Sequence, residues 1–291
     1  MKIKKAVIPA GGFGTRLLPA TKALPKEMYP IVDKPAIQYI VEEAVNSGIT
    51  DILIISNRGK EILENHFDEN PELESLLKKN NKEQMFETVR KISNLANIYF
   101  IRQKEAKGLG HAVLCAKSFV GNEPFAVMYP DDVIYSENIP VCKQLIEVYN
   151  EFGLCTVGAK EMPENEIGKY GSLKVKNIRD NLFMCTDMIE KPSPEQVMSL
   201  YSILGRCILT PEIFEVLENT SPGVGGEIQL TDAMKIIARK QGMIAVDFIG
   251  QRYDIGSKLG ALVASIEAGL RHAEVSEELK KALRKILGSS K

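Results

Sequence analysis

The sequence has few of the residues that most often bind metals or act as nucleophiles. It contains no tryptophan, three histidines and five cysteines in 291 residues. The cysteine count is odd and no pair is spaced as Cys-x-x-Cys, which argues against a disulfide framework and against a zinc site. No Ser–His–Asp or Cys–His signature is present either. We therefore expect a reduced, cytoplasmic protein.

Long apolar runs and a net charge are also lacking. No apolar run is long enough to span a membrane, and the five residues Ala6–Ala10 are too few for the hydrophobic part of a signal sequence. The 37 basic and 38 acidic residues nearly cancel, which argues against general binding to nucleic acids or anionic membranes. We expect neither kind of partner.

A glycine-rich stretch follows directly after the first predicted strand, Ala6–Ile8. Its three glycines let the backbone turn sharply and approach a ligand closely; they are Gly11, Gly12 and Gly14. Successive N–H groups in such a turn form a concave anion site. Arg16 adds a forked cation that suits phosphate oxygens, and Lys26 adds a compact one. Residues 1–34 carry seven basic and two acidic side chains, so the sequence predicts a site for a small polyanion.

Two well-known glycine motifs do not match this stretch. A P-loop requires Gly-Lys-Ser or Gly-Lys-Thr, which does not follow the turn. The dinucleotide fingerprint could begin at Gly12 and Gly14, but its third position is Leu17, which disfavours a nicotinamide dehydrogenase. The remaining alternative is a plain strand-to-helix turn, and the nearby Arg16 and Lys26 weigh against it.

The order of the predicted elements indicates an α/β fold. A strand, a turn, a helix over 37–47 and a strand over 51–56 follow one another, which is typical of a parallel sheet. Gly48 occupies the position of a helix C-cap. Further helices are predicted over 58–67, as a polar pair over 70–95, from the glycines at 108 and 110 to about residue 116, and over 212–217, 230–239, 259–270 and 274–287. Further strands are predicted over 98–101, 125–129, 156–160, 172–175, 205–209 and 245–249.

Three motifs resemble those of the sugar-1-phosphate nucleotidyltransferases. They are Gly11–Pro19 with Pro25–Pro30, Ala106–Cys115, and Gly226–Ala233. Because they span most of the chain, the resemblance covers its full length, and it is strongest to bacterial enzymes that join UTP and glucose 1-phosphate. It implies a Rossmann-like nucleotidyltransferase fold, with a mixed, mainly parallel sheet flanked by helices, and a reaction that yields UDP-glucose and pyrophosphate.

The resemblance also implies how the chain is organised. We expect residues 1–291 to form a single nucleotidyltransferase domain. Its first half, to about residue 140, would bind the nucleotide, and its second half, from about residue 141, would bind the sugar phosphate. We expect Mg²⁺ as the cofactor and a homo-oligomer, either a dimer or a tetramer.

The nucleotide site is expected at the glycine-rich stretch and at a second glycine loop. Gln103 ends a predicted strand and offers one acceptor and two donors, which suits the flat edge of a base. The resemblance places Gln103 and Gly108 at the uracil; from spacing alone, Gln103 could equally be a surface residue beside a helix start. The full predicted set is Ala10, Gly11, Gly12, Gly14, Thr15, Arg16, Lys26, Gln103 and Gly108.

Carboxylates for the metal follow the predicted strand over 125–129. Asp131 and Asp132 lie past its carboxyl end, where α/β folds bind ligands, and Mg²⁺ prefers oxygen ligands. Since successive strand side chains point to opposite faces, only one of the two would face the site. The resemblance selects Asp131 and leaves Asp132 to cap the turn. It adds Asp254 as a second metal ligand, for which the alternative is a helix N-cap region.

The sugar phosphate requires an acceptor for its hydroxyls and a cation for its phosphate. Glu190 and Lys191 stand side by side in a predicted extended segment before a proline, and they could also be an ordinary exposed pair. The resemblance assigns glucose hydroxyls to Glu190 and the sugar phosphate to Lys191. Gly171 would let the backbone approach the sugar.

The implied chemistry needs no general base, because the attacking phosphate oxygen is already ionised near neutral pH. Arg16, Lys26 and Asp131 would be the catalytic residues, acting through charge neutralisation and alignment. Two alternatives stay open. One is a related thymidylyl- or adenylyltransferase, and the other is a non-catalytic regulatory relative, which should have lost Arg16, Lys26 or Asp131.

Overall fold

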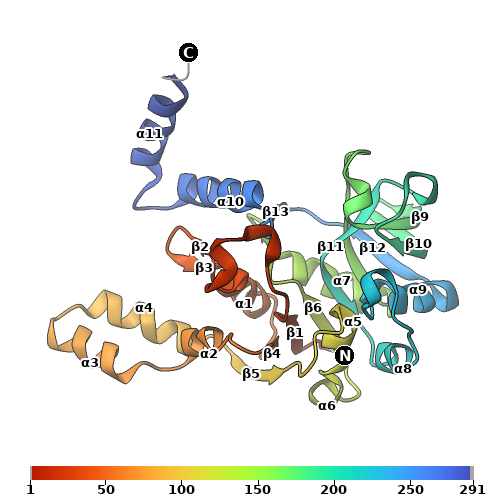
Figure 1. The fold of residues 1–291 in the computed structure, drawn as a ribbon, viewed down its shortest axis with the longest axis horizontal. Coiled ribbons are helices and arrows are strands. Elements are labelled where there is room, and N and C mark those ends of the chain that lie inside the picture. Colours follow the sequence, from red (N-terminus) through yellow and green to blue (C-terminus); the bar gives the residue numbers. More distant parts are fainter. Residues whose placement is uncertain (1, 289–291) are drawn as a thin grey trace.

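The protein, seen in a computed structural model that describes residues 2–288, is built around one large sheet (Figure 1). The nine strands lie in the order β5-β4-β1-β6-β11-β8-β12-β10-β9. In that order their bounds are Asn97–Arg102, Asp51–Ser56, Lys5–Pro9, Phe125–Met128, Tyr201–Leu209, Thr156–Glu161, Met243–Asp247, Leu182–Glu190 and Gly171–Arg179. Helices cover both faces of the sheet, so the predicted α/β class is confirmed.

The strand directions divide the sheet into two parts. β1 pairs in parallel with β4 and β6, and β4 pairs in parallel with β5. β11 then runs antiparallel to both β6 and β8, and β10 runs antiparallel to β12 and β9. The carboxyl ends of the parallel strands therefore meet at one edge, which is where open α/β sheets bind ligands.

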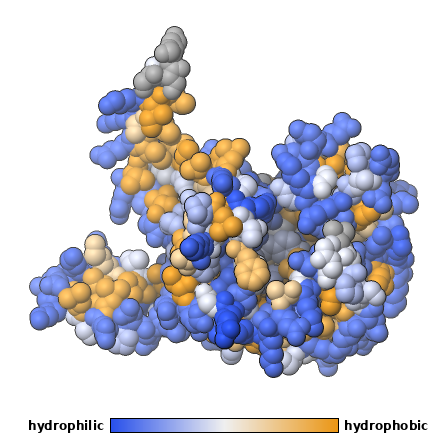
Figure 2. Space-filling model, in the orientation of Figure 1, coloured by the Kyte–Doolittle hydropathy of each residue, from blue (hydrophilic) through white to orange (hydrophobic). Residues whose placement is uncertain are grey.

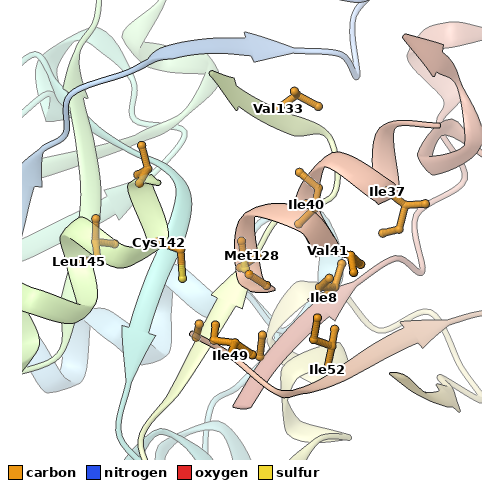
Figure 3. Packing of buried hydrophobic residues seen from close by; sticks show 14 of the residues in the cluster. Ile8, Ile37, Ile40, Val41, Ile49, Ile52, Met128, Val133, Cys142 and Leu145 are labelled. Atoms are coloured by element: carbon orange, nitrogen blue, oxygen red, sulfur yellow. The ribbon is translucent and has the colours of Figure 1, made fainter. Parts of the chain in front are cut away.

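Both faces of the sheet are buried, and alternate side chains of β1 show this. Ile8 belongs to a core cluster with α1 (Ala36–Asn46) and α7 (Val141–Phe152), part of which Figure 3 shows. Val7 belongs to the cluster on the opposite face. That face is covered by α5, α6, α8 and α9, which span Leu109–Leu114, Lys117–Val120, Glu212–Glu218 and Leu230–Gln241. Burial on both faces explains the continuous apolar runs of these strands.

The polar helical pair is confirmed as α3 (Pro71–Lys79) and α4 (Glu83–Ser93), which project from the body in Figure 1. The helix predicted over 58–67 is wrong in its first turn, because α2 spans only Ile62–Phe67. Gly59 has a φ of +82° there, which is incompatible with a right-handed helix. The preceding residues form a turn instead.

Two small sheets and the C-terminal helices complete the fold. β7 (Asp132–Tyr135) pairs with β13 (Gln251–Asp254), which the sequence analysis did not predict, and β2 (Pro30–Ile31) pairs with β3 (Lys34–Pro35). α10 and α11 span Lys258–Arg271 and Ser276–Gly288, and α11 points away from the body in Figure 1. Over residues 2–288, every helix is too short or too polar to cross a lipid bilayer.

Candidate active site

The glycine-rich stretch leaves the carboxyl end of β1 and is held from one side by polar side chains. Lys60 Nζ donates to the carbonyl oxygens of Ala10 and Gly12 at 2.6 and 2.7 Å. Asn57 Nδ2 donates to the carbonyl oxygen of Gly11 at 2.5 Å. The sequence analysis missed both donors, although their place just after the carboxyl end of β4 was an available signal.

The rest of the stretch forms short 3-10 turns. Gly14 has a φ of +65° and precedes the turn Thr15–Leu17. Its carbonyl oxygen accepts from Thr21 Oγ1 at 2.7 Å, which fixes this conformation. Thr15 is exposed at the mouth of the loop. Another 3-10 turn, η3 (Lys26–Met28), brings Lys26 back beside Gly12.

Two cations and two carboxylates meet next to this loop. Lys26 Nζ lies 2.6 Å from Asp131 Oδ2, and Arg16 Nη1 lies 3.2 Å from Asp254 Oδ2. Arg16 also lies 3.8 Å from Asp131. A Cβ at Gly256 would come within 3.0 Å of both carboxylates, so the absence of a side chain there leaves room for them. The structure thus brings together four residues from three distant parts of the chain.

The charges in this cluster stabilise one another. Burial opposes the charge on Lys26, but the carboxylates of Asp131 and Glu27 outweigh it and hold the pKa of Lys26 above its usual range. Burial likewise disfavours ionised Asp131, but Lys26 and then Arg16 outweigh it and hold the pKa of that carboxyl below its usual range. Both Lys26 and Asp131 are therefore charged at neutral pH.

Asp132 has a different partner from Asp131 and does not cap the turn. Asp131 lies in the turn before β7, so the alternation along a strand that the sequence analysis assumed does not apply to it. Asp132 opens β7 and is 4% exposed. Its Oδ1 accepts from Arg252 Nε at 2.7 Å, across the β7–β13 pair. Burial, with a smaller effect of the neighbouring Asp131, raises the pKa of Asp132 in spite of Arg252. Asp132 forms a buried ion pair with Arg252 in place of the expected cap, because β13 places this arginine beside it.

The second glycine loop places Gln103 against the first. Gln103 is 6% exposed, and a Cβ at Gly11 would lie 2.8 Å from its Oε1. Its Nε2 lies 2.8 Å from His111 Nδ1 and donates to the carbonyl oxygen of Gly108 at 3.3 Å. His111, which the sequence analysis gave no role, thus fixes the direction of the Gln103 amide. Gln103, Gly11 and Gly108 therefore lie close together.

The second and third family motifs are packed directly on each other. Gly110 N donates to the Ile228 carbonyl at 2.8 Å, and Ile228 N donates to the Lys107 carbonyl at 2.8 Å. A Cβ at Gly108, whose φ is +98°, would lie 2.9 Å from the Ile228 carbonyl oxygen. Gly108 is therefore required both by its backbone conformation and by this close approach.

Glu190 and Gly171 lie opposite each other in the β10–β9 pair. Glu190 Oε2 accepts from Thr231 Oγ1 at 2.8 Å, and Thr231, which belongs to the third motif, was not predicted to contribute. Lys191 is exposed and has a φ of +45°, so the predicted extended segment ends at Glu190. Because the chain turns sharply at Lys191, the side chain of Lys191 does not point in the direction that a continuing strand would give it.

A tyrosine joins this second area to the cluster of cations and carboxylates. The Tyr170 hydroxyl lies 3.4 Å from Asp254 Oδ2, and Tyr170 directly precedes Gly171. The Tyr170 carbonyl oxygen also accepts from Lys191 N at 3.0 Å. All three groups of predicted site residues are therefore parts of one continuous site.

Comparison with protein families decides what kind of site this is. Residues 5–267 match the model of the nucleotidyl transferase family. The chain belongs to that family. The family assignment made from the three motifs is thereby confirmed.

Individual nucleotidyl transferases resemble this chain over nearly its whole length. A Bacillus subtilis (strain 168) UTP–glucose-1-phosphate uridylyltransferase, YngB, is 50% identical over 278 residues, which is 96% of this chain and 93% of the relative. The solved structure of a UDP-glucose pyrophosphorylase with UDP-glucose is 42% identical, with a TM-score of 0.86 over 93% of this chain and 100% of that one. The UTP-bound enzyme from Acinetobacter baumannii is 37% identical, with a TM-score of 0.88 over 97% of this chain and 98% of that one.

The donor set of this nucleotidyl transferase suits a hard cation shared with a substrate. Within residues 2–288, no three His, Cys, Asp or Glu side chains gather as a complete metal site. Asp131 and Asp254 do converge, with Gly256 between them. Mg²⁺ is commonly bound by one or two carboxylates together with substrate phosphates, so these residues fit such an ion.

Proposed function

We propose that this chain joins UTP and α-D-glucose 1-phosphate into UDP-glucose and releases pyrophosphate. The observation that carries the proposal is the convergence of Lys26 and Arg16 with Asp131 and Asp254 beside the glycine-rich loop. Cations next to a carboxylate pair suit a reaction between polyphosphates. The names and bound molecules of the relatives supply the substrates.

The site residues take separate roles in this proposal. The loop at Gly11 and Gly12, with Arg16 and Lys26, binds the triphosphate, and Gln103 with Gly108 reads the uracil. Glu190 accepts from the glucose hydroxyls, Gly171 lets the backbone approach the sugar, and Lys191 binds the sugar phosphate. The first half of the domain, to about residue 140, therefore binds the nucleotide, and the second half binds the sugar phosphate.

The reaction is an in-line attack of the sugar phosphate oxygen on the α-phosphorus of UTP. That oxygen is ionised at neutral pH, so no side chain needs to remove a proton. Lys26 and Arg16 neutralise charge that shifts toward the leaving pyrophosphate, and the two halves of the site align the reactants. Asp131 and Asp254 would hold Mg²⁺, which supplies further neutralisation of phosphate charge when bound.

The test is a direct assay. The protein is incubated with glucose 1-phosphate, Mg²⁺ and one of UTP, dTTP, ATP, CTP or GTP, and pyrophosphate release is measured. We expect UTP to give the highest rate. A rate with ATP equal to that with UTP would overturn the uridine assignment, and no release with any nucleotide would favour a regulatory relative.

We also propose that the protein is a cytoplasmic homo-oligomer, a dimer or a tetramer. α10 and α11 expose a series of large apolar side chains, and Figure 2 shows the apolar surface along the C-terminal helices. The exposed residues are Leu259, Leu262, Val263, Ile266, Ile286 and Leu287. A second copy of the chain would cover this surface. The five cysteines are all free thiols, four of them buried, which suits a reducing compartment.

The oligomer is tested by replacing apolar residues of α10 that make no contact with the site. Leu259→Glu and Leu262→Glu should lower the mass measured by analytical ultracentrifugation. Met198→Glu, at an exposed apolar residue elsewhere, is the control and should leave the mass unchanged. An unaltered oligomer in the α10 variants would place the contact on another surface.

A further inference from the structure

The glycine-rich loop is held by three consecutive carbonyl groups, all bonded to the same segment. The oxygens of Ala10 and Gly12 accept from Lys60, and that of Gly11 accepts from Asn57. Both donors come from the turn between β4 and α2, and Lys60 lies in the stretch for which the sequence had predicted a helix. Each of the three successive carbonyls is thus bonded to a side chain of this one turn.

The opposite side of the loop is fixed by the geometry of the peptide bond. In a planar trans peptide, the N–H of each residue points away from the carbonyl of the residue before it. The N–H groups of Gly11, Gly12 and Phe13 must therefore point away from Lys60 and Asn57. Among residues 2–288, no protein acceptor meets any of these three N–H groups. Free backbone N–H groups on successive residues are what an anion such as a phosphate requires.

Lys60 can occupy this position because Glu27 balances its charge. Lys60 is 6% exposed and Glu27 is fully buried. Lys60 Nζ lies 2.8 and 2.9 Å from the two carboxylate oxygens of Glu27. A buried ammonium without such a partner would be strongly destabilising. The buried Lys60 ammonium is thus bonded to Ala10, Gly12 and Glu27, and one donor spans both ends of the Ala10–Gly12 segment.

The same short turn connects the loop to the carboxylate cluster. Lys26 and Glu27 are consecutive residues of η3. Lys26 pairs with Asp131, while Glu27 pairs with Lys60 behind the loop. The position of η3 therefore sets the distance between the loop N–H groups and Asp131.

We propose that Lys60 and Glu27 are positioning residues that hold the loop with its N–H groups toward the triphosphate of UTP, without touching the substrate. The proposal rests on the proposed placement of UTP at this loop. A positioning role predicts a specific change in binding. Loss of the pair should weaken binding of the phosphates and leave binding of the nucleoside part unchanged.

The test compares UTP with uridine in a variant that removes both charges together. Lys60→Met with Glu27→Gln keeps the side-chain volumes similar and leaves no buried charge without a partner. We expect its affinity for UTP, measured by calorimetry, to fall about 10- to 100-fold, since several contacts to a charged phosphate are lost. Affinity for uridine, measured by displacement of UTP, should stay within about twofold. That change corresponds to less binding free energy than one typical hydrogen bond contributes.

A milder variant and a matched control complete the design. Asn57→Ala removes one carbonyl contact and should weaken UTP less than the double variant, again without affecting uridine. Lys160→Met with Asp247→Asn removes another lysine–carboxylate pair, 2.6 Å long and remote from the loop, and should affect neither ligand. Circular dichroism establishes that each variant is folded.

The outcomes separate this proposal from the placement of UTP. If the double variant folds and binds UTP normally while Lys26→Ala weakens it, Lys60 does not position the loop. If binding of UTP and binding of uridine weaken equally, the Lys60–Glu27 pair has only a structural role. The same follows if neither Asn57→Ala nor the double variant folds. If Lys26→Ala and the double variant both bind UTP normally, the nucleotide lies elsewhere and the proposed site is wrong.

Discussion

Lys26 Nζ and Asp131 Oδ2 lie 2.6 Å apart, although 105 positions separate the two residues in the chain. The pair joins the turn after the glycine-rich loop to the carboxyl end of β6. Each residue shifts the pKa of the other toward the charged form. A change at either one therefore alters the charge of both.

Asp131→Asn should fold and lose most of its turnover. Asparagine has nearly the same shape but no charge, so the anionic ligand that we propose for Mg²⁺ would be lost. Loss of one electrostatic partner of a transition state costs about 10²- to 10³-fold in rate. Initial rates against Mg²⁺ concentration, with UTP affinity measured separately, would show whether the rate falls more than binding does.

The informative control is Asp132→Asn, because its side chain faces Arg252 instead of the cluster. We expect this variant to have a lower melting temperature, since a buried ion pair is broken, and a turnover much closer to the unaltered protein. If Asp132→Asn were inactive and Asp131→Asn active, the metal would lie on the other face of the strand. Normal rates in both variants would make Asp254 the first candidate.

Lys191→Ala should weaken use of glucose 1-phosphate and leave UTP binding nearly intact. A charge-assisted phosphate contact is worth about 1.5–3 kcal/mol, or roughly one to two decades in affinity. Lys176→Ala, at an exposed lysine of β9, is the matched control. Loss of UTP binding with unchanged KM for glucose 1-phosphate would reverse the proposed division into two halves.

Gln103→Leu should raise the KM for UTP more than it lowers kcat. In the unaltered protein, His111 directs the amide of Gln103. Leucine is similar in size but apolar, so about 0.5–1.5 kcal/mol of binding free energy is lost for each neutral hydrogen bond to the base. The ratio of UTP to ATP turnover should fall as well. An unchanged ratio in a folded variant would mean that another group reads the base.

We expect the protonation of His66 to make the protein less stable in mild acid. Burial lowers the pKa of His66 below its usual value of 6.5, and its Nε2 lies 3.1 Å from Gln38 Oε1. The unfolded chain therefore binds the proton first, and stability present above pH 6.5 is lost as pH falls through the lower folded pKa.

His66→Gln tests that prediction by removing the titrating group. Unfolding by urea would be compared between about pH 8 and about pH 5 in the variant and the unaltered protein. We expect a smaller loss of unfolding free energy in the variant over this range. Equal losses in the two proteins would assign the acid sensitivity to carboxylates alone.

The sequence alone was enough to predict features that depend on neighbouring residues. The buried strands, the glycine-rich turn and the polar pair α3–α4 all follow from local periodicity and composition. Asp131 and Asp132 were predicted to differ in their surroundings, and they do have different partners, Lys26 and Arg252. Local rules succeeded there because each depends on the conformation of only a few consecutive residues.

The tertiary structure decided which distant residues meet. The sequence predicted that Lys60 lies in a helix. The positive φ of Gly59 rules out a helix at this point, and Lys60 instead donates to a carbonyl of the glycine-rich loop. Arg252 reaches Asp132 only because β13 pairs with β7, and Thr231 reaches Glu190 only because the third motif lies beside β10. Such contacts depend on strand order and on the packing of separate elements, which no local pattern of residues specifies.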